Sequence, residues 1–326
     1  MIPKFKIIAD KEDITELLNG RLLSLDITDE FGVVSDTATL EIDNRDDALA
    51  IPPRGASLEI FIGYDQLYPM GKFIADEIEI KSPPNTMIIT ARASDSTMRD
   101  IGAYLAPRSQ SWENKSLQSI VKTISGRYGL SAAIAPEFAD IMITHADQAD
   151  ESDCAFIQRI AEDNGAVVKI ANGKMLFIEP LSGKFPDGTP VPTITIQKES
   201  IGEYRMRLAD RGKYGKVVAK YYDFDKAKEQ EVSTGAEAPV FTLRETFINR
   251  RTAQARAKAK LAAIIHGTKT LSLSIIGNPT LSAESKITLV GMPDDLGGDW
   301  IIKSTKHNLS SSGYTTKIEA TQQGGK

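Results

Sequence analysis

The sequence has little of several residue types, and each shortage excludes a class of protein. Only one of the 326 residues is a cysteine, Cys154, so no disulfide can form within the chain and no zinc site can use several cysteines. Only three histidines occur, His145, His266 and His307, and none has the spacing of paired metal ligands. The single cysteine is typical of a protein that folds in a reducing cytosol.

Long apolar runs and an excess of positive charge are also missing. No apolar stretch approaches the ~18–20 residues of a membrane-spanning helix, so no membrane insertion is expected. The first ten residues contain Pro3, Lys4 and Lys6 and lack the apolar core of a secretory signal. Lys and Arg number 39 and Asp and Glu 44, so the net charge of −5 argues against general nucleic-acid binding, which needs a basic surface.

The motifs of common enzyme classes are absent together. The sequence contains no G-x-S-x-G, no P-loop, no G-x-G-x-x-G and no H-E-x-x-H. Cys154 lies at a predicted helix start beside Glu151 and Asp153, whose negative charges oppose thiolate formation, so we interpret it as a small packing residue. No catalytic residue, cofactor, cofactor-binding residue or metal ligand is therefore predicted.

What is present predicts a mainly β protein of more than one domain. Hydrophobic residues make up 41% of the chain, enough for more than one core, and a length of 326 residues suggests about two domains. Residues 1–95 are predicted to form a first small β-barrel, because apolar and polar residues alternate there in several runs. These runs are Arg21–Asp29, Thr37–Asp43, Ser57–Gly63, Gly71–Ile80 and Thr86–Ala93.

Residues 96–185 change character and predict a compact α/β module inserted between β regions. Asn114 or Ser116 can cap a helix that carries one apolar face and stops at Gly129. Ser152 can cap a second helix that ends at Asn164-Gly165, and a strand pair follows it around a predicted turn at Ala171–Gly173.

Strands return over 186–326, the predicted second barrel, and one helix at about 252–266 interrupts them. That helix is basic at its start. Because aromatic residues do not alternate with its basic residues as in nucleic-acid readers, we interpret it as a solvated face or a contact with an acidic partner.

The two β regions resemble each other. A strand that ends at Gly63 corresponds to one that ends at Gly291, 228 residues later, and Phe73 corresponds to Trp300 at an offset of 227. If this repeat is real, three chains in a ring would present six similar barrels. Two β stretches can also resemble each other by chance, and the sequence alone leaves that alternative open.

At this point the sequence resembles a known family, the late control D proteins of contractile-tailed bacteriophages and phage-tail-like bacteriocins, which form the baseplate hub. The resemblance covers nearly the whole chain and is carried by segments that look like fold determinants. They are Asp13–Thr15, Arg21–Glu30, Ser35-Asp36, Ile51–Gly55, Gly63-Tyr64, Met70–Phe73, Arg108-Ser109, Ser111-Trp112, Asp147-Gln148, Glu151–Asp153, Asn164–Ala166, Gly277–Pro279, Trp300 and His307.

The resemblance implies a fold and a role. The fold is mainly β with an α/β insert, namely two tube-like β-barrels and a small α/β module, similar to the hub part of type VI secretion spike proteins. The role is a structural, non-enzymatic hub in a virion or tail-like particle assembled in the host cytoplasm. A homotrimer with pseudo-sixfold symmetry would join the hexameric tail tube to the trimeric central spike. Tape-measure and baseplate wedge proteins are further implied partners, and the end at Lys326 predicts no fused wall hydrolase.

Three acidic residues are candidates for the wall of a channel through such a ring. Glu77 and Glu79 alternate with apolar residues in one predicted strand, and Glu41 does so in another. A negative wall repels phosphates, so DNA or a tape-measure protein would pass without binding. The plainer interpretation is the solvated face of a sheet.

Two other functions remain open. A wall-degrading tail enzyme would place its acids in the 96–185 module, where Asp140, His145, Asp147, Glu151 and Asp153 occur. A cell-wall glycan-binding protein is the other alternative, because the first helix region resembles wall-binding folds.

Overall fold

A computed structural model describes residues 2–32, 36–47, 49–93, 101–171, 173–209, 214–236, 238–293 and 296–322. The chain divides into two units, each made of separate parts of the sequence. The first unit comprises Met1–Ser96, Pro192–Met206 and Leu271–Ala320, and the second comprises Thr97–Val191, Arg207–Thr270 and Thr321–Lys326. The sequence predicts three consecutive domains instead, at 1–95, 96–185 and 186–326. That these three ranges form two tube-like barrels and an α/β module stays a prediction.

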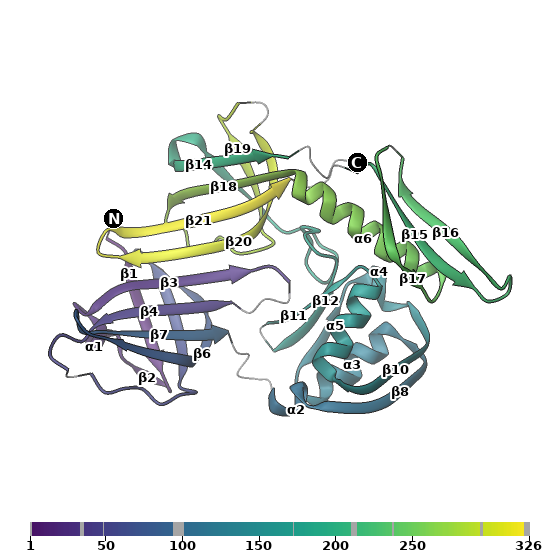
Figure 1. Ribbon diagram of the computed structural model, residues 1–326. Helices are drawn as coiled ribbons and strands as arrows, with labels where there is room; N and C mark the ends of the chain where they lie inside the picture. The colour runs from purple at the N-terminus through teal and green to yellow at the C-terminus, as the bar shows by residue number, and fades with distance from the viewer. Residues whose placement is uncertain are drawn as a thin grey trace. The chain divides into compact units, whose positions relative to one another are not determined.

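The first unit is built on one 13-stranded sheet (Figure 1). Its strands are β1 (Lys4–Ala9), β2 (Glu12–Asp13), β3 (Leu22–Glu30), β4 (Thr37–Asp43), β5 (Ser57–Gly63), β6 (Leu67–Lys81), β7 (Thr86–Ala93), β13 (Thr193–Gln197), β14 (Ile201–Leu208), β18 (Lys269–Ile276), β19 (Lys286–Val290), β20 (Gly298–Ser310) and β21 (Gly313–Gln322). Two short helices accompany them, α1 (Thr15–Leu18) and the 3-10 helix η1 (Lys198–Ser200). The prediction of a mainly β fold is confirmed.

The alternation of apolar and polar residues decides which face of each strand is buried. In β4, Ala38, Leu40 and Ile42 are buried, whereas Thr39 and Glu41 are half-buried on the other face. Successive strand residues point to opposite faces, so one face of the sheet covers the core and the other stays open. Each large aliphatic side chain that is fully buried in this way contributes about 1.5–3 kcal/mol.

Two halves of this sheet have the same strand order. The first half runs β5-β6-β7-β4-β3, and the second half runs β19-β20-β21-β18-β14. In both halves the first two strands are antiparallel, with Leu58 opposite Phe73 and Ile287 opposite Trp300. Phe73 and Trp300 are both fully buried. This is the arrangement expected if the two segments are copies of one unit, with Phe73 corresponding to Trp300.

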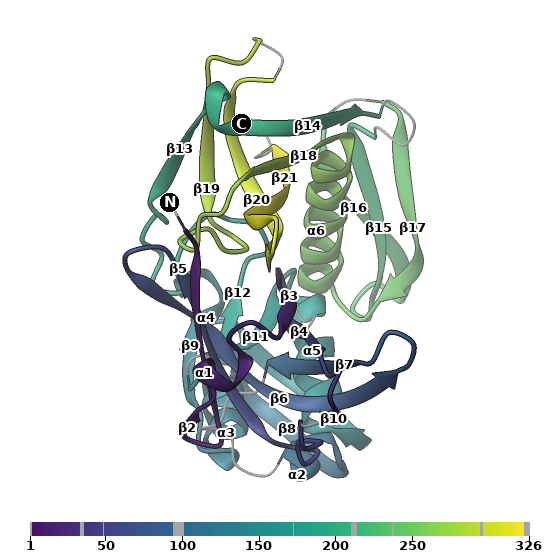
Figure 2. The same cartoon turned by 90° about the vertical axis from the view of Figure 1, so that its left-hand side faces the viewer.

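The halves join through β20, which is long enough to have different neighbours along its length. Its beginning pairs antiparallel with β19, and Ser304 to Ser310 pair antiparallel with β3. β13 lies on the far side of β19 and pairs with it in parallel (Figure 2). The two segments of the predicted repeat therefore form one continuous sheet.

Among its described residues, the second unit contains three small sheets. β8 (Pro107–Ser116) pairs with β10 (Met142–Ser152), and β12 (Lys174–Ile178) lies between β11 (Val167–Ala171) and β9 (Ser131–Ile134). Helices α2 (Ile101–Leu105), α3 (Leu117–Arg127), α4 (Pro136–Ala139) and α5 (Asp153–Asp163) belong to this part. The third sheet, β15 (Lys216–Asp223), β16 (Lys228–Gly235) and β17 (Val240–Phe247), packs against α6 (Arg250–Thr268).

Helices α3 and α5 begin at capping serines. Ser116 accepts a hydrogen bond from the backbone N–H of Ser119 at 3.2 Å, and Ser152 accepts one from that of Ala155 at 3.1 Å, so both predicted caps are confirmed and Asn114 is not the cap of α3. The predicted turn at Ala171–Gly173 includes Asn172, which lies outside the described residues. No helix in the described part of the chain is long and apolar enough to span a bilayer.

Candidate functional site

The three predicted channel acids lie on one face of the first half of the sheet. Glu41 of β4 is opposite Ile88 of β7, and Ile88 is opposite Glu79 of β6. Glu77 is opposite Thr90 one step further along the same two strands. We call this face, which carries Glu41 and lies opposite the buried core residues of β4, the open face. The structure therefore brings Glu41, Glu77 and Glu79 together across three adjacent strands.

The surroundings of these acids differ. Glu41 is half-buried in the interior of the sheet and accepts a weak hydrogen bond from Ser24 Oγ at 3.4 Å. Glu77 and Glu79 are exposed, and Lys81 Nζ lies 3.5 Å from Glu79 Oε2. A β-bulge between Ala75 and Glu77 interrupts β6 at Asp76. Glu77 and Glu79 follow this irregularity and stand at the outer strand of the face.

Opposite charges also meet on the open face where the two halves join. Asn308 Nδ2 donates to Asp26 Oδ1 at 2.9 Å, and Lys306 Nζ lies 3.3 Å from the same oxygen. Asp26 belongs to β3 and the other two residues belong to β20, so the acid is on the first half and the cation on the second half. Cross-strand pairs of opposite charge stabilise the pairing of the two strands that carry them.

The core side of the second half contains a buried histidine. His307 Nδ1 lies 2.8 Å from the Tyr314 hydroxyl, and Nε2 lies 3.1 Å from the carbonyl oxygen of Leu281. Burial lowers the pKa of His307 below its ordinary value and raises the pKa of Tyr314. Both groups are therefore neutral at pH 7, and their contacts explain a polar core residue without a catalytic role.

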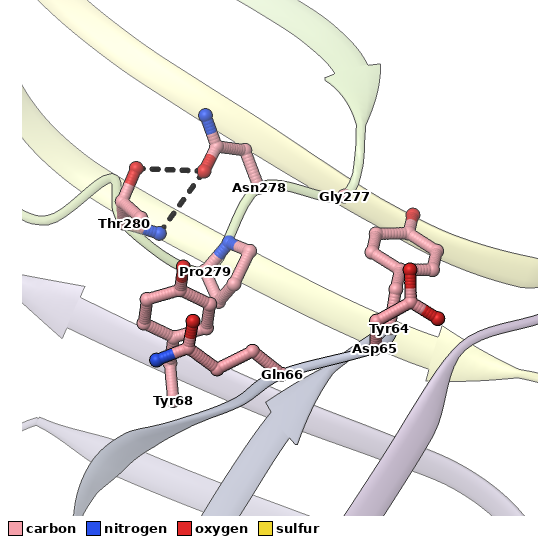
Figure 3. A pocket seen from close by; sticks show the side chains of 8 residues that line it. All are labelled: Tyr64, Asp65, Gln66, Tyr68, Gly277, Asn278, Pro279 and Thr280. Carbon is pink, nitrogen blue, oxygen red and sulfur yellow. Dashed lines mark hydrogen bonds between the residues drawn. The ribbon is translucent and has the colours of Figure 1, made fainter. Parts of the chain in front are cut away.

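A pocket of about 270 Å³ lies near this cluster (Figure 3). Tyr64, Asp65, Gln66 and Tyr68 line it, together with the segment Gly277–Thr280. The Asn278 side-chain oxygen already accepts two hydrogen bonds from Thr280, at 3.0 Å from its backbone N–H and 2.7 Å from its hydroxyl. A Cβ at Gly277 would overlap the Tyr314 ring, so glycine permits the close packing behind the pocket. The pocket wall is a packing arrangement without convergent catalytic groups.

The acids of the 96–185 module do not converge on one site. His145 Nε2 lies 3.0 Å from Asp147, while Glu151 forms an ion pair with Arg159 at 2.7 Å. Asp153 is completely buried, and Asp140 is exposed. Among the described residues, no group of three or more His, Cys, Asp and Glu side chains could hold a metal ion.

Asp153 is a structural residue at the start of α5. Its carboxylate accepts hydrogen bonds from Tyr128 at 2.6 Å, Gln148 at 2.8 Å and Arg127 at 2.8 and 2.9 Å. Burial opposes its ionisation, but these hydrogen bonds and the Arg127 charge outweigh burial and hold the pKa of Asp153 below its ordinary value. Burial together with Asp153 raises the pKa of Tyr128 to about 12. The neighbouring Cys154 is partly buried and packs against the core of this module.

The basic start of α6 contacts acids of its own unit. Arg256 pairs with Glu162 at 3.2 Å and with Asp163 at 3.1 Å, and both acids lie in the last turn of α5. Arg251 donates to the side chain of Asn164. The acidic partner that the sequence suggests is therefore, for these residues, another helix of the same chain.

Comparisons with known proteins assign the chain to a family. The sequence profile of the family described as Phage tail baseplate hub (GPD) matches residues 97–313. The probable baseplate hub protein of Escherichia phage P2 is 30% identical, covering 98% of this chain and 93% of that protein. The chain belongs to the phage tail baseplate hub family. A second hub relative, from Escherichia phage 186, is 29% identical over 98% of this chain and 92% of its own length.

Solved structures show the fold of this hub family member at lower identity. A tail protein from Neisseria meningitidis MC58 has a TM-score of 0.73 at 13% identity, covering 99% of this chain and 98% of that one. The Escherichia coli c3393 protein, a component of the type VI secretion system with structural similarity to bacteriophage T4 tail proteins gp27 and gp5, has a TM-score of 0.58 at 10% identity. The match covers 93% of this chain and 74% of the c3393 chain. The predicted resemblance to the baseplate hub is confirmed.

The sequence does not indicate that residues 201–208 form an edge strand. β14 ends the strand order, and it carries charged residues at Glu203, Arg205 and Arg207 on one side. Tyr204, Met206 and Leu208 alternate with them, so the period-two signal was present in the sequence.

Proposed function

We propose that three copies of this chain form a ring that is the baseplate hub of a contractile phage tail. The single observation that carries the proposal is the presence of two sheet halves with one strand order in each chain. Three chains then supply six similar halves, and closed cyclic assembly makes a pseudo-sixfold ring accessible. Such a ring matches a hexameric tail tube on one side and a trimeric central spike on the other.

The channel of the ring would be lined by the open face of the sheet. Glu41, Glu77 and Glu79 share that face, and a wall with negative charge repels phosphates that pass along it. The passing polymer is DNA or the tape-measure protein, and no specific nucleic-acid binding is proposed. The further partners are the spike, the tube and the baseplate wedge proteins.

The proposed role is structural, without turnover of substrate. The acids and the histidine of the 96–185 module are separated into ion pairs and a buried network, which supports this assignment over wall degradation. On purified peptidoglycan, we expect no product from the wild-type protein and no difference with Glu151→Gln. Release of soluble muropeptides that depends on Glu151 would contradict the proposal.

The molar mass of the purified protein tests the trimer. Light scattering after size exclusion at high protein concentration should give about 107 kDa, three times the 35.6 kDa of one chain. If the protein is monomeric alone, the measurement is repeated with the spike co-expressed. A stable dimer, or a monomer in the presence of the spike, would overturn the ring.

A further inference from the structure

The segment that forms the third sheet and α6 differs in charge from the rest of the chain. From Lys216 to Thr268 it contains ten Lys and Arg residues and six Asp and Glu residues, whereas the whole chain has a net charge of −5. Among the described residues, two of these ten cations form ion pairs, namely Lys226 and Arg256. A local excess of cations on an acidic protein is an electrostatic footprint for a partner of the opposite sign.

Helix α6 carries its cations at the end where they destabilise it. Its 19 residues include five Lys and Arg residues and no acid, and Arg250 and Arg251 lie in its first turn. The N-terminus of a helix carries a partial positive charge, so anions stabilise it and cations destabilise it. By contrast, α5 begins with an acid, Asp153, and α3 has a cation, Arg127, in its last turn. The cations at the start of α6 therefore do not stabilise the helix itself.

Two sides of α6 are covered within the second unit. On the side of the third sheet, Ala253 and Ala257 are fully buried, and Leu261 and Ile264 pack beside them (Figure 2). On the side of α5, Arg256 forms its ion pairs with the two acids in the last turn of that helix. These contacts account for two sides of the helix and leave a third.

The third side is exposed along the length of the helix. Its residues follow one another at spacings of seven, four and three positions, which places them on one face: Arg251, Lys258, Ala262 and Ile265. All four are exposed, and Ile265 is 38% exposed. We call this face, together with Arg250 at its start, the outer face of α6. Within the described part of the chain, none of its three cations forms an ion pair.

The chemistry of the outer face changes along the helix. The first half carries all three cations, whereas the segment Leu261–Thr268, with the sequence LAAIIHGT, contains no Lys, Arg, Asp or Glu. A partner that covers the whole face therefore needs acids at one end and apolar residues at the other. From Arg251 to Ile265 the face extends over about four helical turns, roughly 21 Å. An amphipathic helix of that length, with both kinds of residue on one side, has the matching chemistry.

A nucleic acid matches the outer face less well. A DNA duplex carries one charge for every ~1.7 Å of its axis, so its phosphates would also lie against Ala262 and Ile265, where the face offers no cation. The apolar side chains of an amphipathic helix would instead cover these two residues and remove them from water. Ala255 and Ala262 are small, so a second helix can approach to the usual interaxial distance of about 8–10 Å.

We infer that the outer face of α6 binds an acidic amphipathic helix of another protein, with carboxylates beside Arg250 and Lys258 and apolar side chains against Ile265. The carboxylates would also lie near the positive end of the α6 dipole, so they would offset the destabilising effect of Arg250 and Arg251. Opposite charges on the two surfaces speed association and select the partner. The inference goes beyond the proposed ring, because α6 lies outside the large sheet whose two halves support that ring.

Fluorescence anisotropy with a labelled peptide tests this surface on the full-length protein. The probe is an alanine-rich helical peptide of about four turns, with glutamates at one end and leucines at the other end of a single face. A second peptide has the two ends exchanged, so that both helix directions are tested. We expect one of the two peptides to bind, and the double variant Arg250→Glu/Lys258→Glu to weaken its binding by about tenfold or more. The same peptide with lysines in place of glutamates should not bind.

The matched control is Lys122→Glu/Lys174→Glu, which makes the same change in net charge at two exposed lysines elsewhere in the second unit. It should change the affinity by less than about twofold, because distant surface charges are screened by salt. An equal loss in both double variants would overturn the site, since binding would then follow net charge alone. Failure of both peptides to bind the wild-type protein would also overturn it. A DNA duplex of the same length that binds as tightly, and no longer binds the α6 variant, would assign the face to nucleic acid instead.

Thermal unfolding separates a binding role of these cations from a structural one. Arg250→Glu places an anion in the first turn of α6, so the melting temperature should rise by about 1–3 °C while peptide binding weakens. A melting temperature that falls by several degrees would show that Arg250 stabilises the fold, and would overturn its assignment to a partner. The molar mass of the wild-type protein reports on the ring and peptide binding reports on α6, so the failure of one proposal is distinguishable from the failure of the other.

Discussion

The two halves of the large sheet share one strand order but are built from the chain in different ways. All five strands of the first half come from residues 22–93. In the second half, β14 and β18 are separated by a complete additional sheet, β15–β17, and by helix α6. Strand order therefore depends on the core and on strand pairing, because a long insertion between two neighbouring strands leaves the order unchanged.

The outer neighbours of the halves also differ. β1 pairs antiparallel with β5, whereas β13 pairs in parallel with the corresponding β19. The buried aromatic residue of the second strand is retained as Phe73 in one half and Trp300 in the other. The inner five strands are therefore the common unit, and the residues that pack or turn within them are the places to test it.

Replacing the buried aromatic residues should have the largest effect. Phe73→Ala and Trp300→Ala should each lower the free energy of unfolding by about 3–5 kcal/mol, because each leaves a large cavity. Trp300→Ala should cost more, because Trp300 Nε1 also donates to the carbonyl oxygen of Leu296 at 3.2 Å. Urea unfolding followed by circular dichroism measures both, and in Trp300→Ala the fluorescence of the remaining Trp112 reports separately on the second unit. A negligible cost at one position would show that the halves are not equivalent.

Alanine substitutions at the corresponding hairpin glycines, Gly63 and Gly291, should have an intermediate effect on stability, and the effect should differ between the two halves. A Cβ at Gly63 would overlap the backbone oxygen of Gln66, so Gly63→Ala should cost about 3 kcal/mol, since the hairpin must shift. Gly291 has a φ of +79° and only an ordinary contact with Lys198, so Gly291→Ala should cost about 1 kcal/mol from backbone strain. Thermal unfolding of the two variants side by side measures the difference, and equal costs would contradict it.

The dependence of stability on pH should be the smallest effect, and it should come from the second half. Because burial lowers the pKa of His307 from 6.5, the folded state binds its proton less readily than the unfolded state. Stability is therefore complete above the unfolded pKa and declines as the pH falls below about 6.5, by at most roughly 1 kcal/mol between pH 7 and pH 5.5. Urea titrations at the two pH values measure this loss.

His307→Gln is the control for that experiment. Glutamine cannot take up the proton, so the difference between the two pH values should shrink even if the variant is less stable overall. Asp153 does not contribute in this range, because its lowered pKa affects stability only below about 3.8. An unchanged slope in His307→Gln would assign the pH dependence to other groups.

The sequence predicts those elements in which one face is uniformly apolar. The helix α3 is an example, because Leu117, Ile120, Val121 and Ile124 are all buried at helical spacing. The shared face of Glu41, Glu77 and Glu79 was also predictable in part, because strand alternation fixes the face within each strand. The register across β4, β7 and β6 then brings the three residues together, and only the structure gives that register.

Other features could not be predicted, either because their sequence pattern is weak or because the partner strand lies far away in the sequence. β8 is a ten-residue strand with the sequence PRSQSWENKS, and only Trp112 in it is buried, so its pattern is that of a polar loop. The pairing of β3 with β20 joins Asp26 to Asn308, which are 282 positions apart, and no local pattern indicates such a contact. The edge strand β14 is an intermediate case. The sequence shows its alternation of apolar and charged residues, but it does not show that the strand lacks a neighbour on one side.

The late position of β20 in the chain has a consequence during protein synthesis. The strand β3 is complete by Glu30, but its neighbour β20 begins only at Gly298. At roughly 5–20 residues per second, the ribosome leaves that edge without its partner for roughly 15–50 seconds. The nascent hub therefore carries an open, partly apolar strand edge through most of its translation, when other nascent chains and chaperones compete for it.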